Sequence, residues 1–339
     1  MKKTQTNNPF LPVSPIFESR DAIARRKIAV GLEDELAGLR QLDDRRRIWD
    51  FIIFEGLWLL GAALALTGAQ HADAWHWPLL VLGILLAAIG LNANALLLHE
   101  GMHYTLFRSP TLNRWVAALL GASVLISFHA YRVMHTSHHT FLGDPRDPDD
   151  YRRVTQNRRV LFFLQYLRIS IGAWVYIVMI PFSAWRRGNA HDRRGIAEDY
   201  ALMAVIYAAL WLLLPGWITL YAWFLPIVLV AWMTGIRGLT QHGLTDSEDA
   251  LTASRTILAN PIVEFCLLSE NYHLEHHLFP EIPSYHLHTL HQLVWPRLPR
   301  AATGHSYLGF VGQFVRATAT LDETPVGLIE PTSHEINHR

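Results

Sequence analysis

Nine of the 19 histidines in this sequence fall into four short stretches. Two stretches contain the pattern H-x-x-H-H, one contains a pair of histidines four residues apart, and one contains a single histidine. Residues three and four positions apart share one face of a helix, so each multi-histidine stretch can present its imidazoles to one metal centre. The histidines are His99 and His103 in HEGMH, His135, His138 and His139 in HTSHH, His242 in TQHG, and His273, His276 and His277 in HLEHH.

A histidine pair four residues apart is common on surface helices, and HEGMH alone is weak evidence for a ligand pair. Two copies of H-x-x-H-H in one chain are not expected from its histidine content by chance, and they favour metal binding. Imidazole binds zinc, copper, iron and nickel, so the spacing does not select the metal. Cys266 is the only cysteine, which excludes internal disulfides and sites built from several cysteines of one chain. We find no G-x-G-x-x-G or P-loop pattern that would indicate a nucleotide or flavin domain.

The elements that must position these histidines are long apolar stretches. Crossing the hydrocarbon core of a membrane as a helix takes about 20 residues, and we therefore predict four spans. The stretches 115–128 and 160–182 are less suited to crossing the membrane, because the first is short and the second contains Gln165 and Arg168. We expect both stretches to lie in the membrane interface or to re-enter from it. A large soluble helical core is the alternative, which the run lengths disfavour. The predicted spans are 51–69, 77–98, 199–214 and 217–235.

The basic residues predict the orientation of these spans. Arginine and lysine are frequent before the first span and between the second and third, whereas the connections 70–76 and 215–216 contain none. The positive-inside rule therefore places both termini and the long middle connection in the cytoplasm. HEGMH begins where the second span ends, and TQHG and HLEHH follow the fourth, so all four histidine stretches are expected on the cytoplasmic side. In a bacterium this membrane would be the inner membrane.

The order HEGMH, HTSHH and, after two further spans, HLEHH resembles the three-histidine-box pattern of the membrane fatty-acid desaturase superfamily. The flanking sequences LFRSPTLNRW, GDPRDPDDY and NYHLEHHLFPEIPSYHL are similar to that family as well, and the resemblance covers roughly residues 50–300. We predict an all-α integral membrane protein with about four transmembrane helices, interfacial helices and a cytoplasmic histidine-rich cap. Its expected parts are a polar, basic N-terminal segment (1–48), a catalytic domain (49–315) and a flexible C-terminal tail (316–339).

The resemblance implies an oxygen-dependent enzyme that desaturates a fatty-acyl chain or related lipid. Family members hold two irons with eight or nine histidines, which gives the ligand role to the eight histidines of the three boxes, and to His242 as the additional histidine between the second and third boxes. Dioxygen would be the co-substrate, and electrons would come from an external carrier such as ferredoxin or cytochrome b5. A lipid hydroxylase or ketolase on the same scaffold is the first alternative. A non-redox, histidine-rich metal-binding membrane protein is the second.

Membrane lipids are expected partners, and nucleic acid is not. The arginine-rich middle connection could attract an acidic electron carrier, although anionic lipid headgroups explain the same charges.

Polar residues beside the boxes are candidates for orienting the ligands, because a ligating histidine usually donates its other ring N–H to a carboxylate or carbonyl. Residues 144–150 can equally form a solvated turn, and Asn271 can bind a water, bind a polar group of the substrate or cap a helix. His286, His288 and His291 are also helically spaced, but we expect them to line an interfacial helix. The orienting candidates are Glu100, Asp144, Asp147, Asp149, Asp246, Glu270, Asn271 and Glu275.

Overall fold

The computed structural model describes residues 19–71, 74, 76–246, 249–298 and 301–328. Almost all of its regular structure is helical, and the two strands in the described chain, β1 (Arg255–Ile257) and β2 (Ala302–Gly304), are three residues long and pair in parallel. The prediction of an all-α membrane protein is confirmed.

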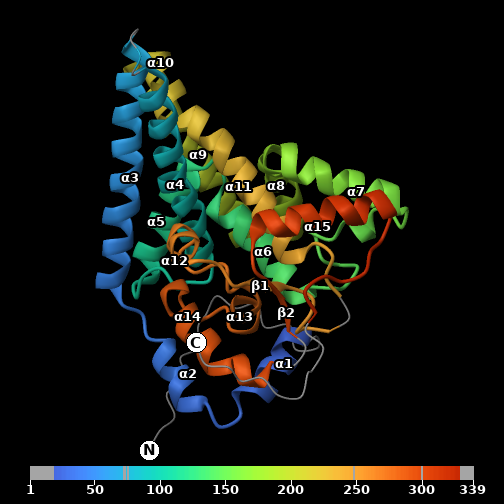
Figure 1. Ribbon diagram of the computed structural model, residues 1–339. Coiled ribbons are helices and arrows are strands. Elements are labelled where there is room, and N and C mark those ends of the chain that lie inside the picture. The colour runs from blue at the N-terminus through green and yellow to red at the C-terminus, as the bar shows by residue number, and fades with distance from the viewer. Residues whose placement is uncertain (1–18, 72–73, 75, 247–248, 299–300, 329–339) are drawn as a thin grey trace, which may run out of the picture.

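Five helices or continuous helix runs among the described residues are long and apolar enough to cross a membrane. Four of them cover the four predicted spans, except that the helix over 199–214 ends at Leu213. The fifth, Arg158–Arg187, contains the predicted interfacial stretch, and by length and composition it qualifies as well. Figure 1 shows this run lying crosswise to α3 and α4; its interfacial position stays a prediction. The runs are α3 (Asp44–Gln70), α4 (His76–Met102), α7 (Arg158–Leu167) with η2 (Arg168–Gly172) and α8 (Ala173–Arg187), α9 (Ala190–Leu213), and α10 (Gly216–Thr219) with η3 (Leu220–Phe224) and α11 (Leu225–His242).

Small residues allow α3 and α4 to pack backbone against backbone. A Cβ atom added at Gly61 would collide with the backbone of Ala87, and one added at Gly83 would collide with that of Ala65. Close approach through small residues is how membrane helices gain packing energy in a solvent that is itself apolar. This pairing fixes α4, whose last turn carries the first histidine box.

The second histidine box lies on α6 (Phe128–Phe141), which meets α5 (Pro110–Ser123) at 97°. Ser127 caps the start of α6 by accepting a hydrogen bond from the Ala130 amide. Asp199 on α9 accepts hydrogen bonds from the Ser127 hydroxyl and the His129 amide, both at 2.8 Å. The sharp bend and this double anchor direct α6 toward the end of α4.

A cap of short elements covers the ends of α3 and α4 nearest the histidine boxes (Figure 1). Its apolar core joins Ile28 and Leu36 from the N-terminal helices to Leu274, Phe279 and Leu290. The N-terminal segment is therefore packed against the third box. The cap contains α1 (Arg20–Ala29), α2 (Glu33–Leu39), β1, α12 (Pro261–Cys266), α13 (His273–Leu278), η4 (Ser284–His286), α14 (Leu287–Val294), η5 (Trp295–Arg297) and β2; η1 (Tyr151–Arg153) follows α6.

The C-terminal helix α15 (Tyr307–Thr320) packs Phe310 and Phe314 against Leu239 of α11. Beyond it, the Val326 amide donates a hydrogen bond to the Leu244 carbonyl at 3.0 Å. The expected boundary of the tail at residue 316 falls inside α15.

Candidate metal centre

Four elements bring the nine predicted histidines together where the membrane helices meet the cap. The first box closes α4, the second lies on α6, His242 is the last residue of α11, and the third box forms α13. Among the described residues, the ligand atoms of these histidines form two adjoining groups. In the contact between the groups, the rings of His139 and His277 stack with their centroids 4.2 Å apart.

The first group contains five histidines from all three boxes, with one ligand nitrogen of each lying within 4.8 Å of the others. The distance from His135 Nε2 is 2.9 Å both to His99 Nε2 and to His139 Nε2. Five imidazoles therefore face one small volume. The members are His99, His103, His135, His139 and His276.

The second group contains His138, His242 and His277, again with ligand nitrogens within 4.8 Å of one another. His273 joins it, because its Nε2 lies 2.8 Å from His242 Nε2 and 3.2 Å from His277 Nε2. All nine histidines singled out in the sequence therefore belong to one of the two groups.

The nitrogen spacing suits metal ions. When two imidazole nitrogens bind one ion at about 2.1 Å each and at right angles, the two nitrogens lie about 3 Å apart. The nitrogen–nitrogen distances in the first group are close to this value. His103 Nε2 and both ring nitrogens of His276 are buried without a hydrogen-bond partner in the described chain. Burial, followed by the neighbouring imidazoles, lowers the pKa of His276 and of His273 well below the ordinary value. These rings are neutral at pH 7, as metal binding requires.

Two of the expected carboxylates contact a box histidine through its second ring nitrogen. Asp147 lies 3.0 Å from His138 Nδ1, and Glu270 lies 3.2 Å from His99 Nδ1. Asp149 is 3.9 Å from the same nitrogen of His138. A carboxylate in this position fixes the ring orientation and tautomer, leaving Nε2 for the metal.

Glu100, inside the first box, is held by a different network. Arg47, whose side chain is fully buried, donates to Glu100 at 2.6 Å and to Asp50 at 3.2 Å. The Ser284 amide donates to Glu100 at 2.9 Å, and the guanidinium of Arg47 lies over the ring of Tyr285. This network joins the start of α3, the end of α4 and the loop after the third box.

Glu275, inside the third box, contacts residues of the cap. His291 Nδ1 lies 2.5 Å from one of its carboxylate oxygens, and the Thr256 hydroxyl donates to the other. Asn271 donates to the Ile257 carbonyl at 2.9 Å and so links the start of α13 to β1. Both side chains thus brace α13 within the cap.

The remaining candidates lie farther from the imidazoles or take part in turns. Asp144 forms an ion pair with Arg146, whose side-chain hydrogen bond lowers the pKa of Asp144 to about 2, as in a solvated turn. The carbonyl of Asp246 accepts a hydrogen bond from Thr252. His288 contacts Glu264 at 2.8 Å on the outer side of the cap.

Two further residues contribute to the site, and the sequence carried no local signal for either. Asp21 on α1 places a carboxylate oxygen 3.5 Å from His277 Nδ1, with both side chains buried. Arg255 is also buried and donates to the carbonyls of Thr240 and Gly243 at the end of α11, which positions His242. Burial lowers the pKa of Arg255 to about 10, so the side chain stays charged at neutral pH.

Comparison with known proteins shows the family of this chain. The model of the fatty acid desaturase family matches residues 75–309, more than half of the chain. The chain belongs to the fatty acid desaturase family. The resemblance drawn from the histidine boxes is therefore confirmed at the level of the family.

Several characterised desaturases align with this member of the family. Dihydrorhizobitoxine desaturase from Bradyrhizobium elkanii is 30% identical over 239 residues, 63% of this chain and 66% of the relative, slightly less than two thirds of its length. The sn-1 oleoyl-lipid 12-desaturase from Arthrospira platensis is 23% identical, over 73% of this chain and 76% of the relative. The human sphingolipid delta(4)-desaturase/C4-monooxygenase is 24% identical, over 88% of this chain and 90% of the relative. Two Arabidopsis thaliana relatives carry cytochrome b5 and ferredoxin, respectively, in their names.

Proposed function

We propose that this desaturase-family protein uses two irons and dioxygen to desaturate a fatty-acyl chain or a related lipid. The observation that carries the proposal is the convergence of nine histidines into two adjoining groups of five and four. In this proposal each group holds one ion. A pair of irons bound there would supply the oxygen-activating chemistry needed to remove hydrogen from an unactivated methylene group.

The protein's own residues orient the ligands and exclude water. Asp147 and Glu270 hold the rings of His138 and His99 in the tautomer that leaves Nε2 free. Leu274 and Phe279 belong to the buried core of the cap, which keeps bulk water away from the reacting chain. A dry site suits a reaction whose intermediates would otherwise be lost to solvent.

Hydroxylation or ketolation of a lipid is the alternative, supported by the human relative whose name includes both a desaturase and a monooxygenase activity. The two outcomes share the first hydrogen removal. They differ in whether a second hydrogen leaves from the next carbon or an oxygen atom is added to the first. The named relatives differ in the position they oxidise, so the position in this protein's substrate is left open.

The electrons are proposed to come from a separate carrier of the ferredoxin or cytochrome b5 kind, in keeping with the names of two relatives. Such a carrier would approach from the side of the cap, which we propose to be cytoplasmic. The arginines at the ends of α8 and α9 offer a basic surface, although anionic lipids would be attracted to it equally.

Lipid profiling of cells with and without the protein tests the reaction. Desaturation predicts a lipid lacking two hydrogens, whereas hydroxylation predicts a lipid with one added oxygen. Finding either product as the sole product excludes the other reaction. Metal analysis of the purified protein should find two irons per chain, and a single labile zinc would support the non-redox alternative.

Substitution of one ligand tests the site itself. His276→Ala should abolish turnover and lower bound iron without preventing membrane insertion, because His276 offers one nitrogen to the first group and neither of its buried ring nitrogens has a hydrogen-bond partner. His71→Ala is the matched control, since His71 lies at the end of α3 away from the cap and should leave activity unchanged. Full turnover in the His276 variant would remove it from the ligand set.

A further inference from the structure

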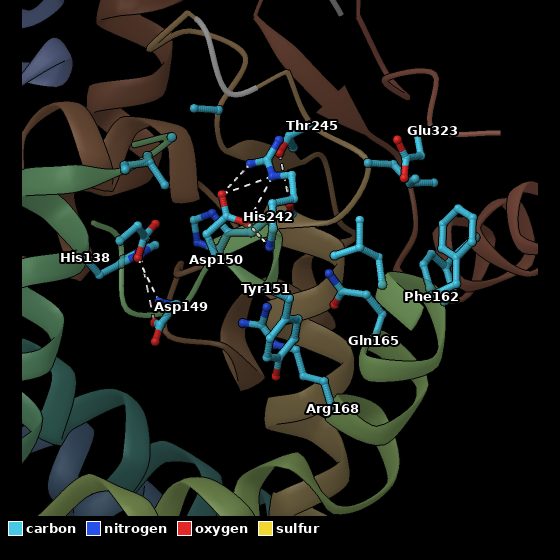
Figure 2. Close-up of a pocket in the computed structure, with 18 residues that line it drawn as sticks. His138, Asp149, Asp150, Tyr151, Phe162, Gln165, Arg168, His242, Thr245 and Glu323 are labelled. Atoms are coloured by element: carbon cyan, nitrogen blue, oxygen red, sulfur yellow. Dashed lines mark hydrogen bonds and ion pairs between the residues drawn. The ribbon is translucent and has the colours of Figure 1, made fainter. Parts of the chain in front are cut away.

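A cavity of about 180 Å³ lies directly beside the second histidine group. His138 and His242 form one side of it, and α7 with the start of η2 forms another, through Phe162, Gln165 and Arg168. Figure 2 shows the two histidines and Gln165 on opposite sides of this space. The cavity is therefore a route by which part of a ligand can reach the proposed metal site.

Two polar groups on the α7 side of the cavity have no partner in the described chain. Gln165 Oε1 is buried and accepts no hydrogen bond. Arg168 is half-buried, and its guanidinium makes no hydrogen bond or ion pair with any described residue. Because no acceptor in the described chain engages it, the Arg168 guanidinium is available to an acceptor that the protein does not itself provide.

The packing of α11 makes room for this guanidinium. A Cβ atom added at Gly238 would lie 2.7 Å from Arg168 Nη2, and one added at Gly235 would lie 2.8 Å from the Arg168 carbonyl oxygen. Two glycines one turn apart thus allow η2 to lie against α11, with the Arg168 side chain extended along it toward His242. The position of the guanidinium is built into the helix contact.

The acidic residues around the cavity are already engaged. Asp147 contacts His138, Asp150 pairs with Arg152 at 2.8 Å, and Glu323 pairs with Arg158 at 3.4 Å. Asp149 faces His138 at 3.9 Å. Arg168 is therefore left as the cation of this cavity without a bonded counter-ion.

We propose that this cavity binds the anionic end of the substrate, a carboxylate or phosphate group, with Arg168 donating to its oxygens and Gln165 making a second polar contact. This inference rests on the proposed lipid oxidation and names the substrate class: an acyl compound with an anionic head. A guanidinium matches both anions because its parallel N–H groups fit two oxygens at once. Since His138 and His242 bound the same cavity, an anionic group held there lies beside the second histidine group.

Equilibrium binding to the iron-loaded protein in uncharged detergent tests the proposal without turnover. The probes are palmitate, a palmitoyl lysophosphatidate and neutral methyl palmitate. Arg168→Gln should weaken binding of the preferred anionic probe by roughly 10- to 100-fold, the loss typical of a charged hydrogen bond, and should leave methyl palmitate binding unchanged. Comparing palmitate with the lysophosphatidate shows whether the head is a free carboxylate or a lipid phosphate.

Arg159→Gln is the matched control, because Arg159 lies on the same helix run but is exposed and does not line the cavity. It should bind all probes like the unaltered protein. Arg168→Lys keeps the positive charge but not the two parallel N–H donors, so it should weaken binding of the anionic probe by an intermediate amount. This variant also tests the proposal if Arg168→Gln does not fold.

Unchanged palmitate and lysophosphatidate binding in both Arg168 variants would overturn the inference, as would equal loss of the neutral ester. These outcomes are separate from the proposed function. If no lipid is oxidised yet anion binding depends on Arg168, only the proposed reaction fails. If a lipid is oxidised yet Arg168 does not affect binding, only this inference fails.

Discussion

Replacing Asp21 by Asn should weaken metal binding in the second histidine group, although Asp21 lies far from the histidine boxes in the sequence. Its carboxylate is 3.5 Å from His277 Nδ1, and the side chains of Asp21 and His277 are 8% and 0% exposed. Removing the charge takes away the group that orients this imidazole. Loss of such a partner typically lowers metal affinity by about 10- to 100-fold.

The assay is iron retained per chain during titration with a chelator, followed by the absorption spectrum of the bound metal. With one iron in each group, as proposed, the Asp21→Asn protein should lose one iron at a lower chelator concentration than the unaltered protein and retain the other. Thermal unfolding of the metal-free proteins should be nearly the same for both, because Asn is similar in size to Asp. This separates orientation of a ligand from a general loss of stability.

Asp34→Asn is the matched control, because Asp34 lies on the neighbouring helix α2 and is exposed. It should retain both irons. Chelator curves of the Asp21 variant that agree within about twofold with those of the unaltered protein would refute the reasoning. An equal loss in the Asp34 variant would do so too, because it would indicate a nonspecific charge effect.

Three further predictions concern the same region. Arg47→Met leaves Glu100 buried without its cation, which should lower the free energy of unfolding by about 3–5 kcal/mol. The measurement is denaturant unfolding in mild detergent, and a decrease below about 1 kcal/mol would contradict the buried network. Asp147→Asn should lower iron affinity about 10-fold or more through His138, whereas Asp144→Asn, in the nearby turn, should not. Removing the metal should lower the unfolding temperature, since bound ions stabilise only the folded state; unchanged unfolding would argue against a metal shared by four elements.

The close contact of the N-terminal helices with the third box changes how this part of the chain is understood. Its arginines indicated a cytoplasmic segment that precedes the first span. In the structure, Ile28 and Leu36 are buried in the same core as Phe279, and Arg25 pairs with Glu281 at 3.1 Å. Shortening the chain before the first span would therefore remove part of the site, including Asp21.

The sequence alone was sufficient for the family and for the membrane-protein fold. Imidazoles three and four residues apart share a helix face whatever the surrounding fold, so the presentation of His135, His138 and His139 from one side of α6 is a local property. Long apolar runs cross a membrane because their backbone polar groups must be satisfied within the helix, which is again local. The family follows from the same motifs and is confirmed by comparison.

Only the tertiary structure decided which histidines share a group. His138 and His139 are neighbours in the sequence, yet adjacent positions on a helix point about 100° apart, and they contribute to different groups. The same holds for His276 and His277. The division into five and four depends on how α4, α6, α11 and α13 meet, which no single segment encodes.

The carboxylates that orient the histidines also could not all be identified from the sequence alone. Asp147 and Glu270 were found by sequence proximity to the boxes, but proximity also suggested Glu275 and Asn271, whose side chains brace the cap instead. Asp21 and Arg255 had no signal, because one comes from a basic segment and the other from the three-residue strand β1. A hydrogen bond between residues distant in the chain exists only once the elements carrying them have packed, and that packing is a property of the whole fold.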